Sequence, residues 1–143
     1  MALVVSATIA YEYVLSANTL DHDAAGQDSL FVRAMHDALT GLPNRRMFRD
    51  RLAQEIKKER RAGLSLALLF IDLDHFKEVN DTHGHLVGDQ VLRVLAAAVK
   101  KIVRATDTIC RFGGEEFIVL MPEAMREEAL AMAERLREKV SDI

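Results

Sequence analysis

Two short acidic clusters hold the residue types in this 143-residue chain that are best suited to chemistry. The first, Asp72-Leu73-Asp74, directly follows a continuous apolar run, residues 66–71, which is typical of a strand buried on both faces. At the period of a strand, both carboxylates project on the same face. Carboxylates at the end of a buried strand are costly unless a positive group neutralises them. The pair is therefore either a cation site or a cap for the next turn.

The second cluster lies at the tip of a predicted hairpin. Gly113-Gly114-Glu115-Glu116 separates two β-prone runs, residues 106–112 and 117–121. A Gly-Gly pair between such runs favours a tight turn, because the turn needs backbone conformations with positive φ. We expect this hairpin to present Glu115 and Glu116 beside the strand end that carries Asp72.

Helices must hold these strands in place, and the apolar periodicity predicts where they lie. Three long helices are expected over residues 45–61, 87–104 and 125–140, and a shorter one over residues 30–36. Residues 75–85 are expected to form a loop or a short helical turn.

The composition fits one folded domain. Hydrophobic residues make up 50% of the chain and charged residues 29%, which is enough to build a buried core. The net charge of −3 leaves no global basic footprint, so a nucleic acid polymer is not an expected partner. The single cysteine, Cys110, excludes an internal disulfide and suits a reducing compartment.

The first 32 residues differ from the rest, because they hold four acidic residues and no Lys or Arg. Residues 1–20 are mostly apolar, but Glu12 lies in their middle and no basic residue precedes them. This pattern is a poor match for a membrane span or a signal peptide. We expect an apolar helix and an acidic linker over residues 1–28, a linker helix over 29–36 and the main domain over 37–143. A membrane tether through the first segment is the alternative.

Residues Arg111-Phe-Gly-Gly-Glu-Glu-Phe117 resemble the signature of the GGDEF family, the bacterial diguanylate cyclases, in its GGEEF form. Three further blocks match in order, at residues 37–46, 70–81 and 84–89. The resemblance runs from about Asp37 to the end of the chain. It implies an α+β fold, a ferredoxin-like or nucleotide-cyclase palm with a βαββαβ-like sheet and flanking helices.

The resemblance also implies an activity, the condensation of two GTP molecules into cyclic di-GMP and two pyrophosphates across a homodimer. Two Mg²⁺ or Mn²⁺ ions per active site would assist. By position, Asp72, Glu115 and the Leu73 carbonyl would be metal ligands, and Glu116 would be a further ligand or the base for the 3′-hydroxyl. The physical logic agrees, because hard divalent ions held by carboxylates neutralise a triphosphate.

Substrate contacts follow from the same resemblance. Asn80 and Asp89 match the guanine readers, and a carboxylate accepts both guanine donors, which favours GTP over ATP. The backbone at His75 and Phe76, the Lys77 ammonium, and the side-chain-free Gly113 and Gly114 would contact phosphates. Each has a plainer alternative: a helix N-terminal acid for Asp89, a solvated charge for Lys77 and the turn itself for the glycines.

Arg104-Ala-Thr-Asp107, just before the hairpin, is similar to the RxxD inhibitory site of the family, where the product cyclic di-GMP binds away from catalysis. Arginine offers a planar fork for a phosphate or a guanine edge, and Asp accepts from guanine. The alternative is an ordinary ion pair between residues three apart at a helix end.

The chain departs from the family pattern at its end, because family domains continue into further strands and a closing helix. We expect a fragment that lacks the last strand and helix, with weakened triphosphate binding. In that topology the last strand pairs beside the first, so residues 66–71 would form a bare apolar edge. The second hypothesis is therefore a non-catalytic module that binds GTP or cyclic di-GMP. An upstream sensor domain and a cytoplasmic catalytic domain are also expected.

Overall fold

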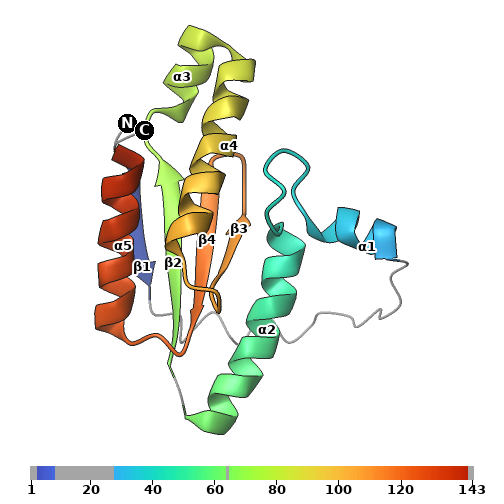
Figure 1. The fold of residues 1–143 in the computed structure, drawn as a ribbon, viewed down its shortest axis with the longest axis vertical. Coiled ribbons are helices and arrows are strands. Elements are labelled where there is room, and N and C mark those ends of the chain that lie inside the picture. Colours follow the sequence, from blue (N-terminus) through green and yellow to red (C-terminus); the bar gives the residue numbers. More distant parts are fainter. Residues whose placement is uncertain (1–2, 9–27, 64, 142–143) are drawn as a thin grey trace.

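The computed structural model describes residues 3–8, 28–63 and 65–141, which form a four-stranded antiparallel sheet with helices on both faces (Figure 1). The strand order is β1-β2-β4-β3. The elements in chain order are β1 (Leu3–Thr8), α1 (Asp28–Met35), α2 (Arg45–Ala62), β2 (Leu66–Leu73), α3 (Phe76–His83), α4 (His85–Ile102), β3 (Thr108–Arg111), β4 (Glu116–Pro122) and α5 (Arg126–Ser141).

The continuous apolar character of β2 and β4 reflects burial on both faces, as the sequence predicted for residues 66–71. Alternate residues such as Leu69 and Val119 pack toward α4 and α5 in one hydrophobic cluster. The residues between them, such as Leu68 and Ile118, pack against α2 in a second cluster. Because side chains alternate along a strand, both faces need apolar residues when helices cover both.

The ends of α2 show why its prediction is nearly correct. The Asn44 side chain accepts a hydrogen bond from the Met47 N–H at 3.1 Å and caps the first turn. Gly63 adopts the left-handed conformation, at φ 67°, and ends the helix. Local capping chemistry of this kind fixes a helix boundary from the sequence alone.

The N-terminal segment is where the prediction was wrong. A helix was expected within residues 1–28, but Leu3–Thr8 forms the strand β1. This strand pairs antiparallel with β2, with Leu3 opposite Leu73 and Thr8 opposite Leu68. The β-branched residues Val4, Val5 and Thr8 suit a strand. The unpaired backbone groups of β2 supply its partner, so the edge of β2 is not bare as predicted.

The rest of the expected N-terminal helix and linker, residues 9–27, lies outside the described residues. The linker helix is present as α1, which begins at Asp28. None of the helices in the described part of the chain combines the length and the apolar character needed to cross a membrane.

Candidate functional site

The register of the sheet brings two predicted carboxylates together. Asp72 on β2 lies directly opposite Glu116 on β4, and both residues are exposed. Directly opposite residues in an antiparallel pair project on the same face, with their Cβ atoms about 4.5–5.5 Å apart. Neither carboxylate makes a hydrogen bond or ion pair within the described residues. Two like charges in this arrangement repel each other unless a cation lies near them.

Asp74 lies outside the strand. Since β2 ends at Leu73, Asp74 falls in the turn before α3, and the strand period no longer applies to it. The strand geometry behind the predicted same-face pair of Asp72 and Asp74 therefore does not extend to Asp74. The partner of Asp72 is Glu116, which lies far away in the sequence.

The hairpin tip places Glu116 against the first glycine. The N–H groups of Phe112 and Gly113 donate to the Glu116 carbonyl at 2.8 and 3.2 Å and close the turn. A Cβ added to Gly113 would lie 2.7 Å from the Glu116 Oε2 atom, whereas one added to Gly114 would meet nothing within 4 Å. Gly113 therefore makes room for the Glu116 carboxylate, and Gly114 leaves open space at the tip. The expectation of positive φ at this turn was wrong, because neither glycine has a positive φ.

Arg111 clamps this hairpin, a role that the sequence analysis missed. Its Nη2 donates to the Gly114 carbonyl at 2.8 Å, and its Nη1 contacts both carboxylate oxygens of Asp37 at 3.1 and 3.2 Å. Asp37 also accepts hydrogen bonds from the Thr40 N–H and hydroxyl. Burial raises the pKa of Asp37, but the hydrogen bonds from Thr40 and Arg111 outweigh burial and lower this pKa below its ordinary value. Both residues belong to the quoted sequence blocks, but their spacing gives no sign that they touch.

The predicted base readers lie on two neighbouring helices, Asn80 on α3 and Asp89 on α4. Gly88 is buried, and a Cβ at this position would lie 1.8 Å from the Asn80 Oδ1 atom. The Asn80 amide thus lies against α4, one residue from Asp89. The plainer explanation of Asp89 as a first-turn acid does not hold, because α4 begins at His85 and its first turn has no acidic residue.

The predicted phosphate contacts gather at the start of α3. His75 precedes the helix with a left-handed backbone, at φ 60°, and its Nδ1 lies 3.3 Å from the Glu78 carboxylate. Phe76 is buried, and Lys77 is exposed with no ion pair among the described residues. An exposed helix start with a nearby ammonium group suits an anion.

The donor set at the strand ends fits a divalent cation. Asp72 and Glu116 offer hard carboxylate oxygens with no cationic partner, and Glu115 follows the hairpin tip. Leu73 has no polar side-chain atom, so this residue, which is 2% exposed as a whole, can offer only its backbone carbonyl. The described residues gather no group of three His, Cys, Asp or Glu side chains placed to hold a metal. Mg²⁺ typically binds one or two carboxylates together with substrate phosphates and water, so the incomplete group is compatible with it.

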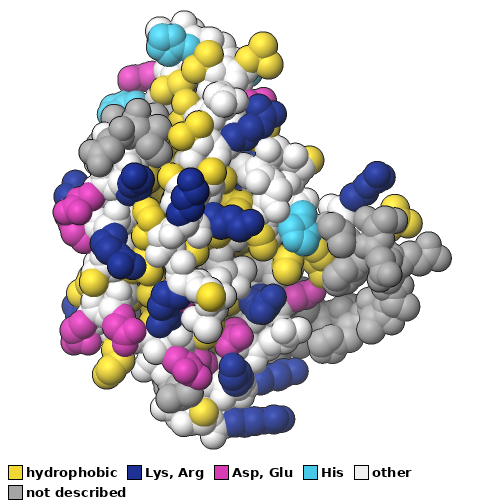
Figure 2. All heavy atoms as spheres, in the orientation of Figure 1, with side chains coloured by type: hydrophobic (Ala, Val, Ile, Leu, Met, Phe, Trp, Pro, Cys, Tyr) yellow, Lys and Arg dark blue, Asp and Glu magenta, His cyan; other side chains and the backbone are white. Residues whose placement is uncertain are grey.

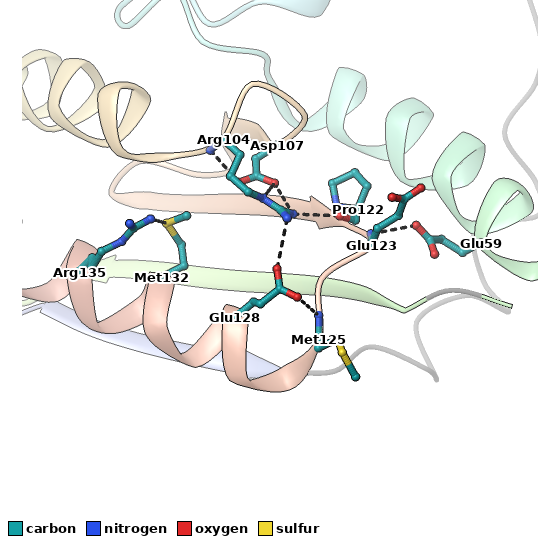
Figure 3. Close-up of polar contacts among 9 residues, drawn as sticks. All are labelled: Glu59, Arg104, Asp107, Pro122, Glu123, Met125, Glu128, Met132 and Arg135. Atoms are coloured by element: carbon teal, nitrogen blue, oxygen red, sulfur yellow. Dashed lines mark hydrogen bonds and ion pairs between the residues drawn. The ribbon is translucent and has the colours of Figure 1, made fainter. Parts of the chain in front are cut away.

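The second predicted site lies at the other end of the sheet, where Arg104 already contacts several protein groups (Figure 3). Its Nε donates to the Asp107 carboxylate at 3.0 Å, and its Nη2 donates to the Pro122 carbonyl at 2.9 Å. Asp107 also accepts from the Arg104 backbone N–H at 2.9 Å, and its side chain is 0% exposed. The hydrogen bond with Asp107 raises the pKa of Arg104 above its ordinary value. Asp107 therefore orients Arg104 in this structure.

A cavity of about 740 Å³ adjoins this pair. Its wall comes from α2, the end of α4 and the start of β3. The charged residues lining the cavity are Arg51, Glu55, Lys58, Lys100, Arg104, Asp107 and Glu123. Such a mixed lining with an excess of cations suits a ligand that carries both phosphates and polar base edges.

The antiparallel sheet, covered by helices on both faces and ending in opposed carboxylates, is the α+β nucleotide-cyclase palm fold that the sequence predicted. The chain belongs to the GGDEF family, since the model of the family described as "Diguanylate cyclase, GGDEF domain" matches residues 34–143.

Two relatives and one solved structure illustrate the similarity. Diguanylate cyclase DgcP of Pseudomonas aeruginosa is 47% identical over 109 residues, covering 76% of this chain and 16% of the relative. Response regulator PleD of Caulobacter vibrioides is 44% identical over 124 residues, covering 87% of this chain and 26% of the relative. The coiled coil and GGDEF domain of DgcB from Caulobacter crescentus, solved in complex with c-di-GMP, has a TM-score of 0.78 at 32% identity and covers 81% of this chain and 61% of that one. This chain thus spans only 16% and 26% of the lengths of the two curated relatives.

Proposed function

We propose that this chain carries the GTP-condensing site of a diguanylate cyclase. The observation that carries the proposal is the pair of opposed, unpartnered carboxylates, Asp72 and Glu116, beside a GGEEF hairpin. Negative charge without a cationic partner suits a site whose ligand is a metal-bound triphosphate. The printed name of the relative DgcP, a diguanylate cyclase, supports the same activity.

In the proposed reaction, the 3′-hydroxyl of each GTP attacks the α-phosphorus of the other, and each attack releases pyrophosphate. Glu116 accepts the hydroxyl proton or joins Asp72, Glu115 and the Leu73 carbonyl in holding Mg²⁺ or Mn²⁺, two ions per site. Such ions neutralise the triphosphate and lower the pKa of a bound hydroxyl. Each domain binds one GTP, so catalysis requires two copies of the domain that face each other.

Asn80 and Asp89 select guanine in this proposal. The Asp89 carboxylate accepts from the guanine N1–H and N2–H₂ groups, and adenine does not offer that donor pair. Lys77 and the start of α3, at His75 and Phe76, hold phosphate oxygens, and Gly114 leaves room for them to approach the hairpin. A cytoplasmic location and an upstream sensor domain remain predictions from the family.

We also propose that the cavity beside Arg104 and Asp107 binds the product, cyclic di-GMP, as an inhibitory site. The support is the cationic lining of the cavity and its distance along β4 from the GGEEF hairpin. The solved complex of DgcB with c-di-GMP is a structural relative with this ligand.

The test is to incubate the purified chain with GTP and Mg²⁺ at high protein concentration and to detect cyclic di-GMP by mass spectrometry. Glu115→Gln is the inactive control, and Glu138→Gln, an exposed change on α5, is the matched active one. Product that persists in the Glu115→Gln variant would contradict the proposed site.

The alternative function is a non-catalytic module that binds GTP or cyclic di-GMP. It is favoured by the lack of a three-ligand acidic group among the described residues. The product assay separates the two, and thermal shift with GTP and with ATP shows whether the chain binds GTP selectively, since a ligand that binds the native state raises its stability by mass action. Selective stabilisation by GTP without product would support the alternative.

A further inference from the structure

The guanidinium of Arg104 has one nitrogen that is only loosely held. Its Nε and Nη2 atoms make bonds of 2.9–3.0 Å to Asp107 and to the Pro122 carbonyl. The Nη1 atom has one partner among the described residues, the Glu128 Oε2 atom, at 3.5 Å. Nη1 is therefore the edge of Arg104 that a phosphate oxygen can reach without breaking the buried bonds to Asp107.

Glu128 occupies that edge with a second carboxylate (Figure 3). Its side chain is 52% exposed and that of Arg104 is 34% exposed, so the pair lies at the surface where a ligand has access. The buried Asp107 already balances the charge of Arg104. The carboxylate of Glu128 consequently repels an incoming phosphodiester more than it stabilises the fold.

Glu128 also has a structural task. Its Oε1 atom accepts a hydrogen bond from the Met125 N–H at 3.5 Å, just before the first turn of α5. A Glu at the third position of a helix commonly accepts from the N–H just before the helix, and Gln can make the same contact. The charge of Glu128 can therefore be removed while its cap is retained.

We propose that Glu128, which does not line the cavity, competes with the ligand for the Nη1 edge of Arg104 and so lowers the affinity of this arginine for phosphodiester-containing guanine dinucleotides. The inference rests on the inhibitory site proposed above. Glu128 thereby acts as a tuning residue, which sets the product concentration at which the site fills. Lys and Arg side chains lie over α4 and α5 on this face, with acidic side chains close by (Figure 2). On such a surface, the affinity for a phosphodiester depends on which acidic side chains must leave their cationic partners before the ligand binds.

The experiment measures the dissociation constant of cyclic di-GMP by titration calorimetry on the full chain, at low and at high salt. Glu128→Gln is expected to bind about two- to fivefold more tightly than the unchanged chain at low salt. This gain shrinks at high salt, because exposed charges are screened. Glu127→Gln removes the same charge from the same turn, where no described residue pairs with it, and leaves the affinity unchanged.

The outcomes separate this inference from the one beneath it. If the unchanged chain does not bind cyclic di-GMP, or if Arg104→Ala binds it equally well, the proposed inhibitory site is wrong. The proposed role of Glu128 is then wrong as well. If Arg104→Ala abolishes binding while Glu128→Gln binds no more tightly than Glu127→Gln, only the role of Glu128 is wrong. Should Glu128→Gln melt early, the titration is repeated at a lower temperature at which thermal unfolding shows the variant to be folded, and the same gain is expected.

Discussion

The two charged sites of this domain are built in opposite ways. At the strand ends, Asp72 and Glu116 are exposed, oppose each other and have no cationic partner among the described residues. At the far end of the sheet, Asp107 is fully buried and Arg104 is bound to it. In the first arrangement, like charges repel each other until a cation binds between them. In the second, the charge of Arg104 is already paired with that of Asp107, so a ligand must displace existing contacts or add to them.

The difference shows how function and stability divide along one sheet. A site that binds metal and triphosphate benefits from uncompensated charge, at a cost to the free energy of unfolding. A site that binds a product can contribute to the fold, because its buried pair satisfies the backbone between α4 and β3. Substitutions at the two sites should therefore separate activity from stability.

The largest effect is expected from Glu116→Gln at the strand ends. Loss of a general base or metal ligand lowers the rate of cyclic di-GMP formation by about 10²–10⁴-fold. The same change removes a repulsive neighbour from Asp72, so the free energy of unfolding stays equal or rises by about 0.2–1 kcal/mol. Mass spectrometry of the product and urea unfolding measure the two quantities. A variant that loses stability along with activity would contradict the proposed repulsion.

At the second site, Asp107→Ala is expected to have its larger effect on stability. Its carboxylate accepts from both the Arg104 backbone N–H and the guanidinium. Loss of these bonds leaves buried donors unpaired and lowers the free energy of unfolding by about 1–3 kcal/mol. Urea unfolding checks this value, with Glu138→Gln as an exposed control. If unfolding is unchanged, Asp107 is not a structural anchor and the comparison fails.

The two glycines of the hairpin sharpen the catalytic side of the comparison. Gly113→Ala brings a Cβ within 2.7 Å of the Glu116 Oε2 atom, so the carboxylate must shift. Gly114→Ala meets nothing within 4 Å in the protein. We expect Gly113→Ala to lower kcat, by about tenfold or more, since small displacements of a catalytic group are costly. Gly114→Ala should mainly raise KM by crowding the phosphates, and steady-state kinetics separates these effects.

Much of the fold was predictable where local chemistry decides it. The Asn44 cap and Gly63 bound α2, and Gly113-Gly114 marks the position of the β3–β4 hairpin, although not through the positive φ that we expected there. The strand Leu3–Thr8 was not predictable in this way. A short apolar segment can form a helix or a strand, and here its pairing with the edge of β2, some sixty residues away, decides for a strand.

The candidate site divides in the same way. The approach of Asp72 to Glu116 follows from a strand end and a hairpin tip, so sequence reasoning found it. The contact of Arg111 with Asp37 joins residues 74 positions apart and follows from the path of the chain around α2. The open space beside Gly114 and the crowding at Gly113 depend on a side-chain conformation, which no sequence pattern states.

The smallest expected effect concerns this Arg111–Asp37 pair, which ties the hairpin to the loop before α2. Because the folded pKa of Asp37 lies below its unfolded value, its ionised form contributes stability above the unfolded pKa. That contribution is lost as the pH falls through the unfolded and then the folded pKa, below about pH 4. Arg111→Gln removes the partner, which lowers stability at neutral pH by about 0.2–1 kcal/mol, since the pair is partly exposed, and weakens its acid dependence.

Urea unfolding from neutral pH to about pH 3 measures both the loss and the slope that linkage predicts. Thr40→Val tests the same carboxylate from its other side, because it removes the hydroxyl bond to Asp37 and leaves Arg111 in place. If the unchanged chain and Arg111→Gln lose stability in parallel on acidification, Asp37 is not held ionised by this pair. The hairpin would then be positioned by its backbone bonds alone, and the exposed carboxylates would need no clamp behind them.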